Sequence, residues 1–228
     1  MKSIIVTGTS KGIGRAICDW FLDHGHRVIE ITRADSITLK SAKENQVIIE
    51  FDWKDYDELL RQMNELSISE VDILINNAGY LKTDDLSSAD LSDFNRHMEV
   101  NVWYPLELTR HLIKREVLSK GAHTLNIGSV GGVQGTLKFG GLFNYSTSKA
   151  ALASLTEFMA IEWGQEGKSF NYLALGAVNT EMLREAFPGY ISEVDPEKMA
   201  ESICSLAMTF GKNASGKIIQ LAKSDPET

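Results

Sequence analysis

Residues 3–24 read SIIVTGTSKGIGRAICDWFLDH, and this stretch decides the fold. Residues 3–7 form a short apolar run, and residues 13–24 show the amphipathic pattern of a helix. Between them, Gly8, Gly12 and Gly14 permit a tight turn and let backbone amides approach a pyrophosphate at the helix N-terminus. The spacing, Gly-x3-Gly-x-Gly, differs from the more familiar Gly-x-Gly-x2-Gly, and an ordinary strand–helix turn is the alternative. Because the turn directly follows the first strand, we favour the phosphate interpretation.

The same alternation of short apolar runs and longer helical patterns continues along the chain. Apolar runs without a clean two-residue alternation are typical of strands that are buried on both faces, as in a parallel sheet. We expect strands at 3–7, 27–32, 47–51, 71–75, 123–127, 169–174 and 217–221, and helices at 13–24, 54–66, 91–120, 146–164 and 196–209. The predicted fold is therefore α/β, a Rossmann-type doubly wound, mostly parallel seven-stranded sheet with helices on both faces. We see no linker or repeat, and we expect residues 1–228 to form a single domain.

The composition limits the classes of partner. The chain of 228 residues has a net charge of −8, which opposes binding to nucleic acid or to an anionic membrane. Cys18 and Cys204 lie far apart in the sequence, which predicts two reduced core thiols and neither a disulfide framework nor a metal site. No signal segment or bilayer-length apolar run is visible, so we expect a cytoplasmic protein.

Two cations indicate which dinucleotide the chain prefers. Arg33 follows the second strand, where such folds meet the adenosine ribose, and a cation there favours a 2′-phosphate. Lys11 adds a second positive charge near the same point. Both cations can also simply lie in solvent, and Asp35 keeps NAD as a competitor. We therefore favour NADP(H), with NAD(H) possible.

The ends of the third and fourth strands carry further candidates. Asp52 ends the third strand, where its carboxylate can accept the adenine amino group or cap the helix expected at Lys54. Residues 76–79 read NNAG, and such small and amide side chains suit a backbone that passes close to a cofactor. A tight turn without a ligand is the alternative for this segment.

A phenol and an ammonium form the candidate proton-transfer site. Tyr145 and Lys149 are four residues apart on an expected helix, so both side chains can point into one cleft. A nearby lysine ammonium favours the phenolate, and we therefore expect Lys149 to lower the pKa of Tyr145. Ser129 follows a strand, where its hydroxyl can hold a substrate carbonyl or alcohol, with a turn or capping serine as the alternative.

The expected helix 91–120 contains a proline. Pro105 has no N–H to donate to the carbonyl of Asn101, so the helix should kink there. The freed carbonyl needs another partner, such as a water that connects Lys149 to solvent. A bent helix whose carbonyl meets solvent is the alternative.

These residues, in this order, resemble the short-chain dehydrogenase/reductase superfamily, in its small single-domain branch. The resemblance covers nearly the whole chain. It implies that Tyr145 is the catalytic acid or base, that Lys149 lowers its pKa and holds the nicotinamide ribose, that Ser129 orients the substrate oxygen, and that Asn101 keeps a relay water. The motifs that carry it are Thr7–Gly14, Asp52, Asn76–Gly79, Asn101, Ser129, Tyr145–Lys149 and Gly176–Met182.

The resemblance also implies a cofactor site and a reaction. The backbone near Val178 and the hydroxyl of Thr180 would grip the carboxamide. The predicted cofactor-binding residues are Gly8, Ser10, Lys11, Gly12, Ile13, Gly14, Arg33, Asp52, Trp53, Asn77, Ala78, Gly79, Tyr145, Lys149, Val178 and Thr180. We expect hydride transfer between NADP(H) and a carbonyl or secondary alcohol substrate, a small molecule whose identity the sequence leaves open. A regulatory protein that binds a dinucleotide without catalysis is one alternative, and an epimerase or dehydratase that uses the same site is another.

Three features depart from the family pattern. Leu175 stands where a proline is usual, so we expect a looser turn at Gly176. Residues 133–144 are longer than usual and predict an enlarged substrate loop, whereas residues 183–194 predict a short lid. The aromatic and aliphatic side chains in both segments predict an apolar pocket.

The remaining candidates receive structural interpretations. We expect His24 and His26 to lie in a solvated turn, and His97 and His111 to be surface or interface residues. The apolar stripe on the expected helix is core by default, and the resemblance implies a homodimer or homotetramer through helices 91–120 and 146–164. The stripe comprises Trp103, Tyr104, Leu108 and Leu112.

Overall fold

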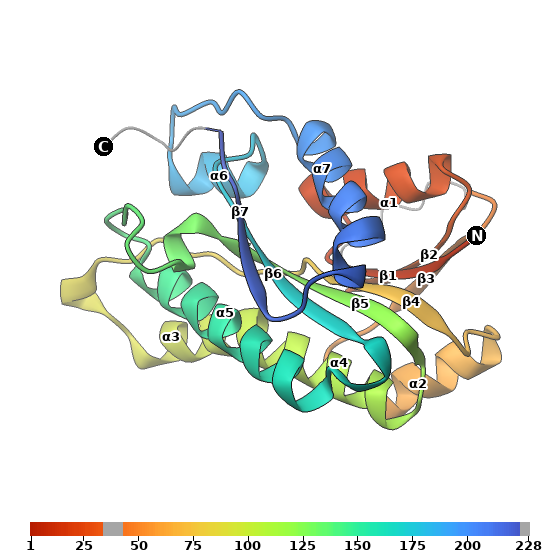
Figure 1. Ribbon diagram of the computed structural model, residues 1–228. Coiled ribbons are helices and arrows are strands. Elements are labelled where there is room, and N and C mark those ends of the chain that lie inside the picture. Colours follow the sequence, from red (N-terminus) through yellow and green to blue (C-terminus); the bar gives the residue numbers. More distant parts are fainter. Residues whose placement is uncertain (34–42, 224–228) are drawn as a thin grey trace.

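A computed structural model describes residues 1–33 and 43–223. In this part of the chain, seven parallel strands form one sheet in the order β3-β2-β1-β4-β5-β6-β7 (Figure 1). The strands are β1 (Ser3–Thr7), β2 (Arg27–Thr32), β3 (Gln46–Glu50), β4 (Val71–Asn76), β5 (Leu118–Ser129), β6 (Ser169–Leu175) and β7 (Lys217–Leu221). The chain moves outward from β1 to β3 and then returns to build β4–β7 on the other side of β1. The predicted doubly wound α/β fold is confirmed, and its topological switch point lies between β1 and β4.

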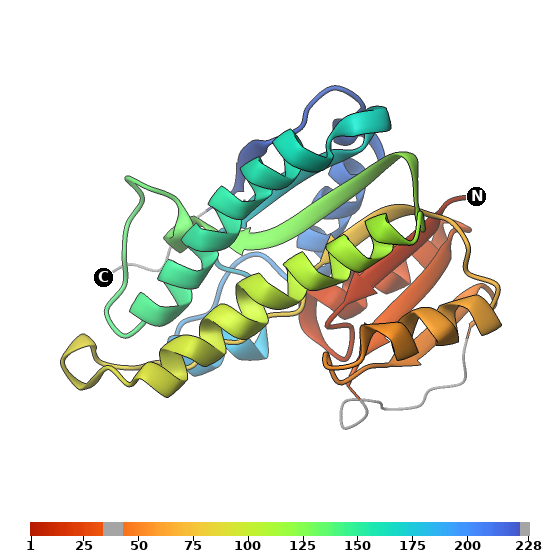
Figure 2. The ribbon, with the colours of Figure 1, turned by 90° about the horizontal axis from the view of Figure 1, so that it is seen from below.

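Helices cover both faces of the sheet. One face carries α1 (Gly12–Asp23) and α7 (Pro196–Thr209), and the other carries α2 (Tyr56–Glu65), α4 (Tyr104–Lys114) and α5 (Phe143–Trp163) (Figures 1 and 2). The shorter elements are α3 (Leu91–Met98), a π-helix η3 (Glu99–Trp103), α6 (Glu181–Ala186) and the 3-10 turns η2 (Leu86–Ser88), η4 (Val130–Gly132), η5 (Gln165–Gly167) and η6 (Phe210–Lys212).

The two apolar cores follow from the alternation of side chains on β1. Ile4 points to the face of α1 and α7, and it is fully buried in a cluster with Ile17 and Ile203. Ile5 points to the opposite face and is buried with Leu108 of α4. Successive side chains of a strand lie on opposite faces, so a strand with helices on both sides is apolar throughout.

The expected helix 91–120 is wrong at its C-terminal end. Helix α4 ends at Lys114, and β5 begins at Leu118, which pairs with Val71 of β4. The first residues of β5 are apolar and follow α4 closely, so they continued the apolar periodicity of the helix past its actual end. At the predicted kink the chain forms η3, in which the N–H of Tyr104 donates to the carbonyl of Glu99. A π-type hydrogen-bond pattern just before Pro105 agrees with the missing N–H of that proline.

The apolar stripe on this rod is mostly intramolecular core. Tyr104, Leu108 and Leu112 are buried, whereas Trp103 is 52% exposed. Figure 2 shows α3, η3 and α4 as one continuous rod beside α5. Among residues 1–33 and 43–223, no helix is long and apolar enough to cross a bilayer. Both cysteines are buried free thiols.

Candidate active site

A cavity of about 830 Å³ lies at the carboxyl ends of the central strands. Its lining includes every predicted site residue except Asn101, which is fully buried behind it. These lining residues are Gly8, Ser10, Lys11, Gly12, Ile13, Gly14, Arg33, Asp52, Trp53, Asn77, Ala78, Gly79, Ser129, Tyr145, Lys149, Val178 and Thr180. The fold therefore brings together residues from almost the whole length of the chain. Asp35 lies outside the described residues.

The glycines of the turn after β1, residues 8–14, are required by its geometry. Gly8 has φ +70°, and a Cβ built there would lie 2.7 Å from the Cα of Ala78. A Cβ on Gly14 would lie 2.2 Å from the carbonyl oxygen of Gly8 and 2.4 Å from Nδ2 of Asn77. Helix α1 begins directly after Lys11, which, among the described contacts, makes no side-chain cap for its first turn. Its first amides therefore face the cavity with room for an anion.

The segment after β4 is fastened to this glycine turn. The hydroxyl oxygen of Thr7 accepts hydrogen bonds from the amides of Asn77 (3.0 Å) and Ala78 (2.9 Å). In return, Nδ2 of Asn77 donates to the carbonyls of Thr7 (2.9 Å) and Gly8 (3.0 Å). Asn76 points the other way, and its Nδ2 donates to Oδ1 of Asn126 in the core at 2.8 Å. From the sequence we placed Thr7 in the glycine-turn motif but gave its hydroxyl no role, although a polar residue at the end of an apolar strand was a signal for one.

The two predicted cations have different surroundings. Lys11 forms an ion pair with Glu181, the first residue of α6, and both side chains are largely exposed. Arg33 is exposed at the end of β2 and lines the cavity. The partner of Lys11 was not anticipated, because Glu181 is 170 residues away in the sequence.

Asp52 lies beside the cavity and does not cap a helix. Its Oδ1 accepts from the amide of Lys54 at 3.1 Å, which makes a local turn. The N-cap of α2 is instead Asp55, whose carboxylate accepts from the amide of Glu58 at 3.0 Å. The helix-cap alternative for Asp52 is therefore wrong, because α2 begins only at Tyr56.

Trp53 forms an aromatic wall of the cavity. Its φ of +67° is in the left-handed region, which is uncommon for a residue other than glycine. Its ring stacks on Tyr104 with a centroid distance of 5.0 Å and an interplanar angle of 4°. The stacked pair joins the end of β3 to the first turn of α4, and both residues line the cavity.

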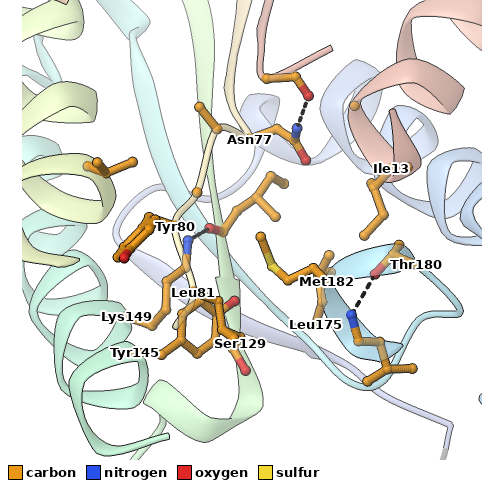
Figure 3. Close-up of a pocket in the computed structure, with 18 of the residues that line it drawn as sticks. Ile13, Asn77, Tyr80, Leu81, Ser129, Tyr145, Lys149, Leu175, Thr180 and Met182 are labelled. Atoms are coloured by element: carbon orange, nitrogen blue, oxygen red, sulfur yellow. Dashed lines mark hydrogen bonds between the residues drawn. The ribbon is translucent and has the colours of Figure 1, made fainter. Parts of the chain in front are cut away.

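The phenol and the ammonium share one side of the cavity. Figure 3 shows Tyr145, Lys149 and Ser129 close together, with Leu175 and Met182 facing them. Nζ of Lys149 donates to the carbonyl of Ile127 at 2.9 Å and lies 5.7 Å from the centroid of the Tyr145 ring. The four-residue spacing on α5 therefore does place both groups in one cleft.

The electrostatics of this pair differ from our expectation. Burial raises the pKa of Tyr145 to about 12, and burial lowers the pKa of Lys149 to about 8. The expected lowering of the Tyr145 pKa by Lys149 is wrong for the structure as it stands. Removal from water disfavours the charged form of each group, and burial is the cause of both shifts.

Ser129 is both a capping residue and a lining residue. Its Oγ accepts from the amide of Gly131 at 3.1 Å and caps η4, so the hydroxyl proton remains available as a donor to the cavity. The amide of Ser129 donates to the hydroxyl of Tyr172 on β6 at 3.0 Å. Sequence reasoning missed Tyr172. Gly128 was the signal, because glycine inside a strand often marks a close approach, and a Cβ there would lie 1.8 Å from Cζ of Tyr172.

Asn101 acts through its side chain in the structure. Its Nδ2 donates to the carbonyl of Tyr80 and to the hydroxyl of Ser148, each at 2.9 Å. Its Oδ1 accepts from the amide of Tyr80 at 2.8 Å. Asn101 therefore fastens the loop after β4 to α5, one residue before Lys149. From the sequence we had expected only the backbone carbonyl of Asn101 to act, by holding a relay water. That water stays a prediction.

His97 is not the surface or interface residue that we expected. It is fully buried, and its ring nitrogens bond to the carbonyl of Asp93 (2.8 Å) and the amide of Lys82 (3.2 Å). Since a carbonyl only accepts, Nδ1 carries the proton and Nε2 accepts from Lys82. The ring also packs on Tyr80 with a centroid distance of 4.7 Å. His97 therefore supports the loop 80–82, of which Tyr80 and Leu81 line the cavity.

The other histidines lie away from this cavity. His111 is half-buried and stacks on Tyr56 at 4.6 Å. His24 is exposed and stacks on Trp20 at 3.8 Å. Within the described ranges, no group of three or more His, Cys, Asp or Glu side chains could hold a metal ion.

The turn after β6 is tied to the edge strand. Leu175 pairs with Leu221 of β7, and the amide of Gly176 donates to the carbonyl of Leu221 at 2.9 Å. The looser turn expected from Leu175 is thus not observed. Thr180 caps α6 by accepting from the amide of Leu183 at 3.2 Å, so a short helix occupies part of the expected lid.

Comparisons with known proteins agree with this geometry. The sequence profile of the short chain dehydrogenase family matches residues 2–190. An uncharacterized short-chain type dehydrogenase/reductase of Sinorhizobium fredii is 32% identical over 191 residues, which are 81% of this chain but only 34% of that longer protein. The 3-oxoacyl-[acyl-carrier-protein] reductase FabG of Escherichia coli is 29% identical over 80% of this chain and 76% of its own.

Two solved structures are similar over nearly the whole chain. A mutant of a Serratia marcescens short-chain dehydrogenase/reductase has a TM-score of 0.80 and 25% identity, with 97% of this chain and 96% of that chain covered. A mutant 4-hydroxyisoleucine dehydrogenase, solved with NADH and succinate, has a TM-score of 0.83 and 25% identity, with 97% of each chain covered.

Proposed function

This chain belongs to the short-chain dehydrogenase/reductase family of NAD(P)-dependent oxidoreductases, and from this premise we propose that it transfers hydride between NADP(H) and a carbonyl or secondary alcohol, with Tyr145 as the proton donor and acceptor. The observation that carries the proposal is the convergence of Tyr145, Lys149 and Ser129 in the cavity that also contains the glycine turn.

The residues present fit a dinucleotide. The first turn of α1 offers backbone amides to a pyrophosphate, and Gly8, Gly12 and Gly14 line the cavity without side chains that would keep the phosphates from the backbone. Val178 and Thr180 would hold the carboxamide end, and Asp52 with Trp53 would lie by the adenine. A nicotinamide ring held there would supply or accept the hydride.

The chain's own residues would handle the proton. In reduction, the O–H bond of Tyr145 breaks and its proton passes to the substrate oxygen, while the hydroxyl of Ser129 donates to the same oxygen. Lys149 would stabilise the resulting phenolate, since its ammonium lies 5.7 Å from the ring centroid, and it would hold the ribose hydroxyls. A raised pKa for Tyr145 keeps the phenol protonated and ready to donate at neutral pH.

The preference for NADP(H) rests on two cations. Lys11 and Arg33 line the same cavity in a chain whose net charge is −8, and a 2′-phosphate would need such local cations. A 4-hydroxyisoleucine dehydrogenase of the same fold is described with NADH, so NAD(H) is the second candidate.

Replacement of Tyr145 with Phe tests the mechanism. We expect Tyr145→Phe to lower kcat for NADPH-dependent reduction of a ketone panel by about a hundredfold to ten-thousandfold, because the proton donor is lost while the ring remains. NADPH binding, measured by fluorescence, should stay within a few-fold of wild type. Tyr190→Phe is the matched control, because Tyr190 lies outside the cavity lining, and it should retain activity.

Unchanged turnover of Tyr145→Phe would rule out this role for Tyr145. Cofactor binding without turnover on any carbonyl would instead favour a regulatory protein. Conversion of a substrate without net oxidation of the cofactor would favour an epimerase or dehydratase.

We also propose a homo-oligomer through the α4 and α5 side of the molecule. Trp103 (52%), Phe158 (58%) and Ile161 (76%) expose large apolar surfaces on η3 and α5. Apolar side chains gathered on neighbouring elements are typical of subunit interfaces.

A further inference from the structure

Two aromatic rings meet in the lining of the cavity. Phe139 comes from the loop 133–144, and Phe187 directly follows α6. Their ring centroids are 5.1 Å apart at an interplanar angle of 82°, an edge-to-face contact. Both residues are half-buried and line the cavity. The contact therefore joins the loop that leads into α5 to the segment that directly follows α6.

Apolar side chains from α6 and from the start of α5 also line the cavity. Leu142 forms the N-cap of α5, and its carbonyl accepts from the amide of Ser146 at 2.8 Å, so it lies one turn from the phenol. Met182 and Ala186 of α6 line the facing side. Aliphatic and aromatic walls around a reacting oxygen bind uncharged groups and exclude water.

Basic side chains close in sequence to Phe139 and Phe187 already have acceptors, as does Arg96 of the cavity wall, whose Nη1 donates to Oε2 of Glu99 at 2.7 Å. Nζ of Lys138, next to Phe139, donates to the carbonyl of Val133 at 2.6 Å and to Oγ1 of Thr136 at 3.0 Å. Arg184 of α6 is exposed and donates to Oδ1 of Asn179, on the glycine-turn side of the cavity, at 3.4 Å. A carboxylate or phosphate on the substrate would thus lose water and would have to compete with these acceptors for a cation.

We propose that the Phe139–Phe187 pair sets the upper size limit of the substrate, and that the site takes compact, uncharged carbonyl compounds, with an aryl group as the best fit. This inference rests on the proposed function. An aryl ring can pack on the edges or faces of both phenylalanines. A larger ring system can enter only if the pair separates, which would also detach the loop from α6.

The test compares three methyl ketones as probes with the whole enzyme and NADPH. Acetophenone is the compact neutral probe, 4-acetylbenzoate adds a carboxylate, and 2-acetylnaphthalene adds a fused ring. For wild type we expect kcat/KM for acetophenone to exceed each of the other two by about tenfold or more, which is the discrimination that pocket contacts of this size supply. In Phe187→Ala, the ratio of 2-acetylnaphthalene to acetophenone should rise by about tenfold, whereas the carboxylate should remain a poor substrate.

Two further variants keep the result interpretable. Phe139→Leu removes the ring from the other segment with less loss of volume, and it should shift the same ratio in the same direction even if Phe187→Ala folds poorly. Leu137→Ala is the matched control, because Leu137 lies in the same loop, is 49% exposed and is not part of the cavity lining. It should leave the ratio unchanged.

The outcomes separate this inference from the proposed function. If wild type reduces the ketones but prefers 4-acetylbenzoate, or if Phe187→Ala and Phe139→Leu both leave the size ratio unchanged, the size and charge inference is overturned while the oxidoreductase function stands. If NADPH binds but no carbonyl is reduced by wild type, the proposed function itself fails, and the inference fails with it.

Discussion

The two ends of the cavity are built in different ways. At the cofactor end, Gly8 and Gly14 pack so closely that a Cβ on either would collide with backbone or with the side-chain amide of Asn77, and Thr7 and Asn77 lock the turn with hydrogen bonds. At the substrate end, Phe139 and Phe187 meet through side chains from segments 48 residues apart. The first end depends on backbone geometry and tolerates little change. The second depends on side-chain packing, so its substrate can change while the scaffold is kept.

The strongest test of this contrast is Gly14→Ala. The added Cβ would lie 2.2 Å from the carbonyl oxygen of Gly8, so the glycine turn must move away from α1. We expect the Kd for NADPH to rise by about a hundredfold, since overpacking of this kind costs up to about 3 kcal/mol. Titration of intrinsic fluorescence with NADPH measures the effect, and circular dichroism checks that the variant is folded.

Gly140→Ala is the control for this substitution. No described atom lies within 4 Å of a Cβ built on Gly140, in the loop at the substrate end. Its Kd for NADPH should stay at the wild-type value. A folded Gly14→Ala protein with wild-type affinity would remove the distinction between the two ends.

Lys149 stands at the junction of the two ends, and its charge should be visible in the pH dependence of activity. Burial lowers the pKa of Lys149 to about 8, below its ordinary value of 10.5, so the ammonium is present at lower pH and is lost as the pH rises through this value. We expect kcat/KM for reduction to be constant below about pH 7 and to have fallen by about tenfold at pH 9. Initial rates with NADPH and acetophenone from pH 6 to 10 measure this profile.

The profile also distinguishes the two titrating groups. Burial raises the pKa of Tyr145 to about 12, so loss of its own proton cannot cause a decline near pH 8. Activity that stays level up to pH 10 would show that Lys149 keeps its proton through this range, and the lowered pKa would then be wrong.

The same division explains what the sequence could predict. The strand–helix alternation and the glycine spacing are local patterns, so the sheet, the glycine turn and the shared face of Tyr145 and Lys149 could be read directly. The end of the long helix could not, because the apolar residues at the start of β5 continued its periodic pattern. The helix 91–120 therefore had to be shortened to end at Lys114.

Contacts between distant segments were not predictable in this way. Nothing near His97 in the sequence indicates that its ring would hold the amide of Lys82, and nothing near Ser129 names Tyr172 as its partner. The prediction that Lys149 lowers the pKa of Tyr145 was wrong for a related reason. The spacing shows that an ammonium is near, but only the folded structure shows how thoroughly both groups are removed from water.

The smallest expected effect concerns the charges at the cofactor end. Lys11 pairs with Glu181 on α6, and a 2′-phosphate would have to compete with that carboxylate for the ammonium. Glu181→Gln keeps the shape of the side chain and releases Lys11. Because exposed ion pairs are weak, we expect the Kd for NADPH to fall by only about twofold, with no change for NADH.

The gain in NADPH affinity should disappear at high salt, where exposed charges are screened. The control variant Glu185→Gln, on the same helix, should show no gain. Equal tightening of NADPH and NADH would mean that Lys11 does not read the 2′-phosphate, and the cofactor end would then owe its selectivity to backbone geometry and Arg33.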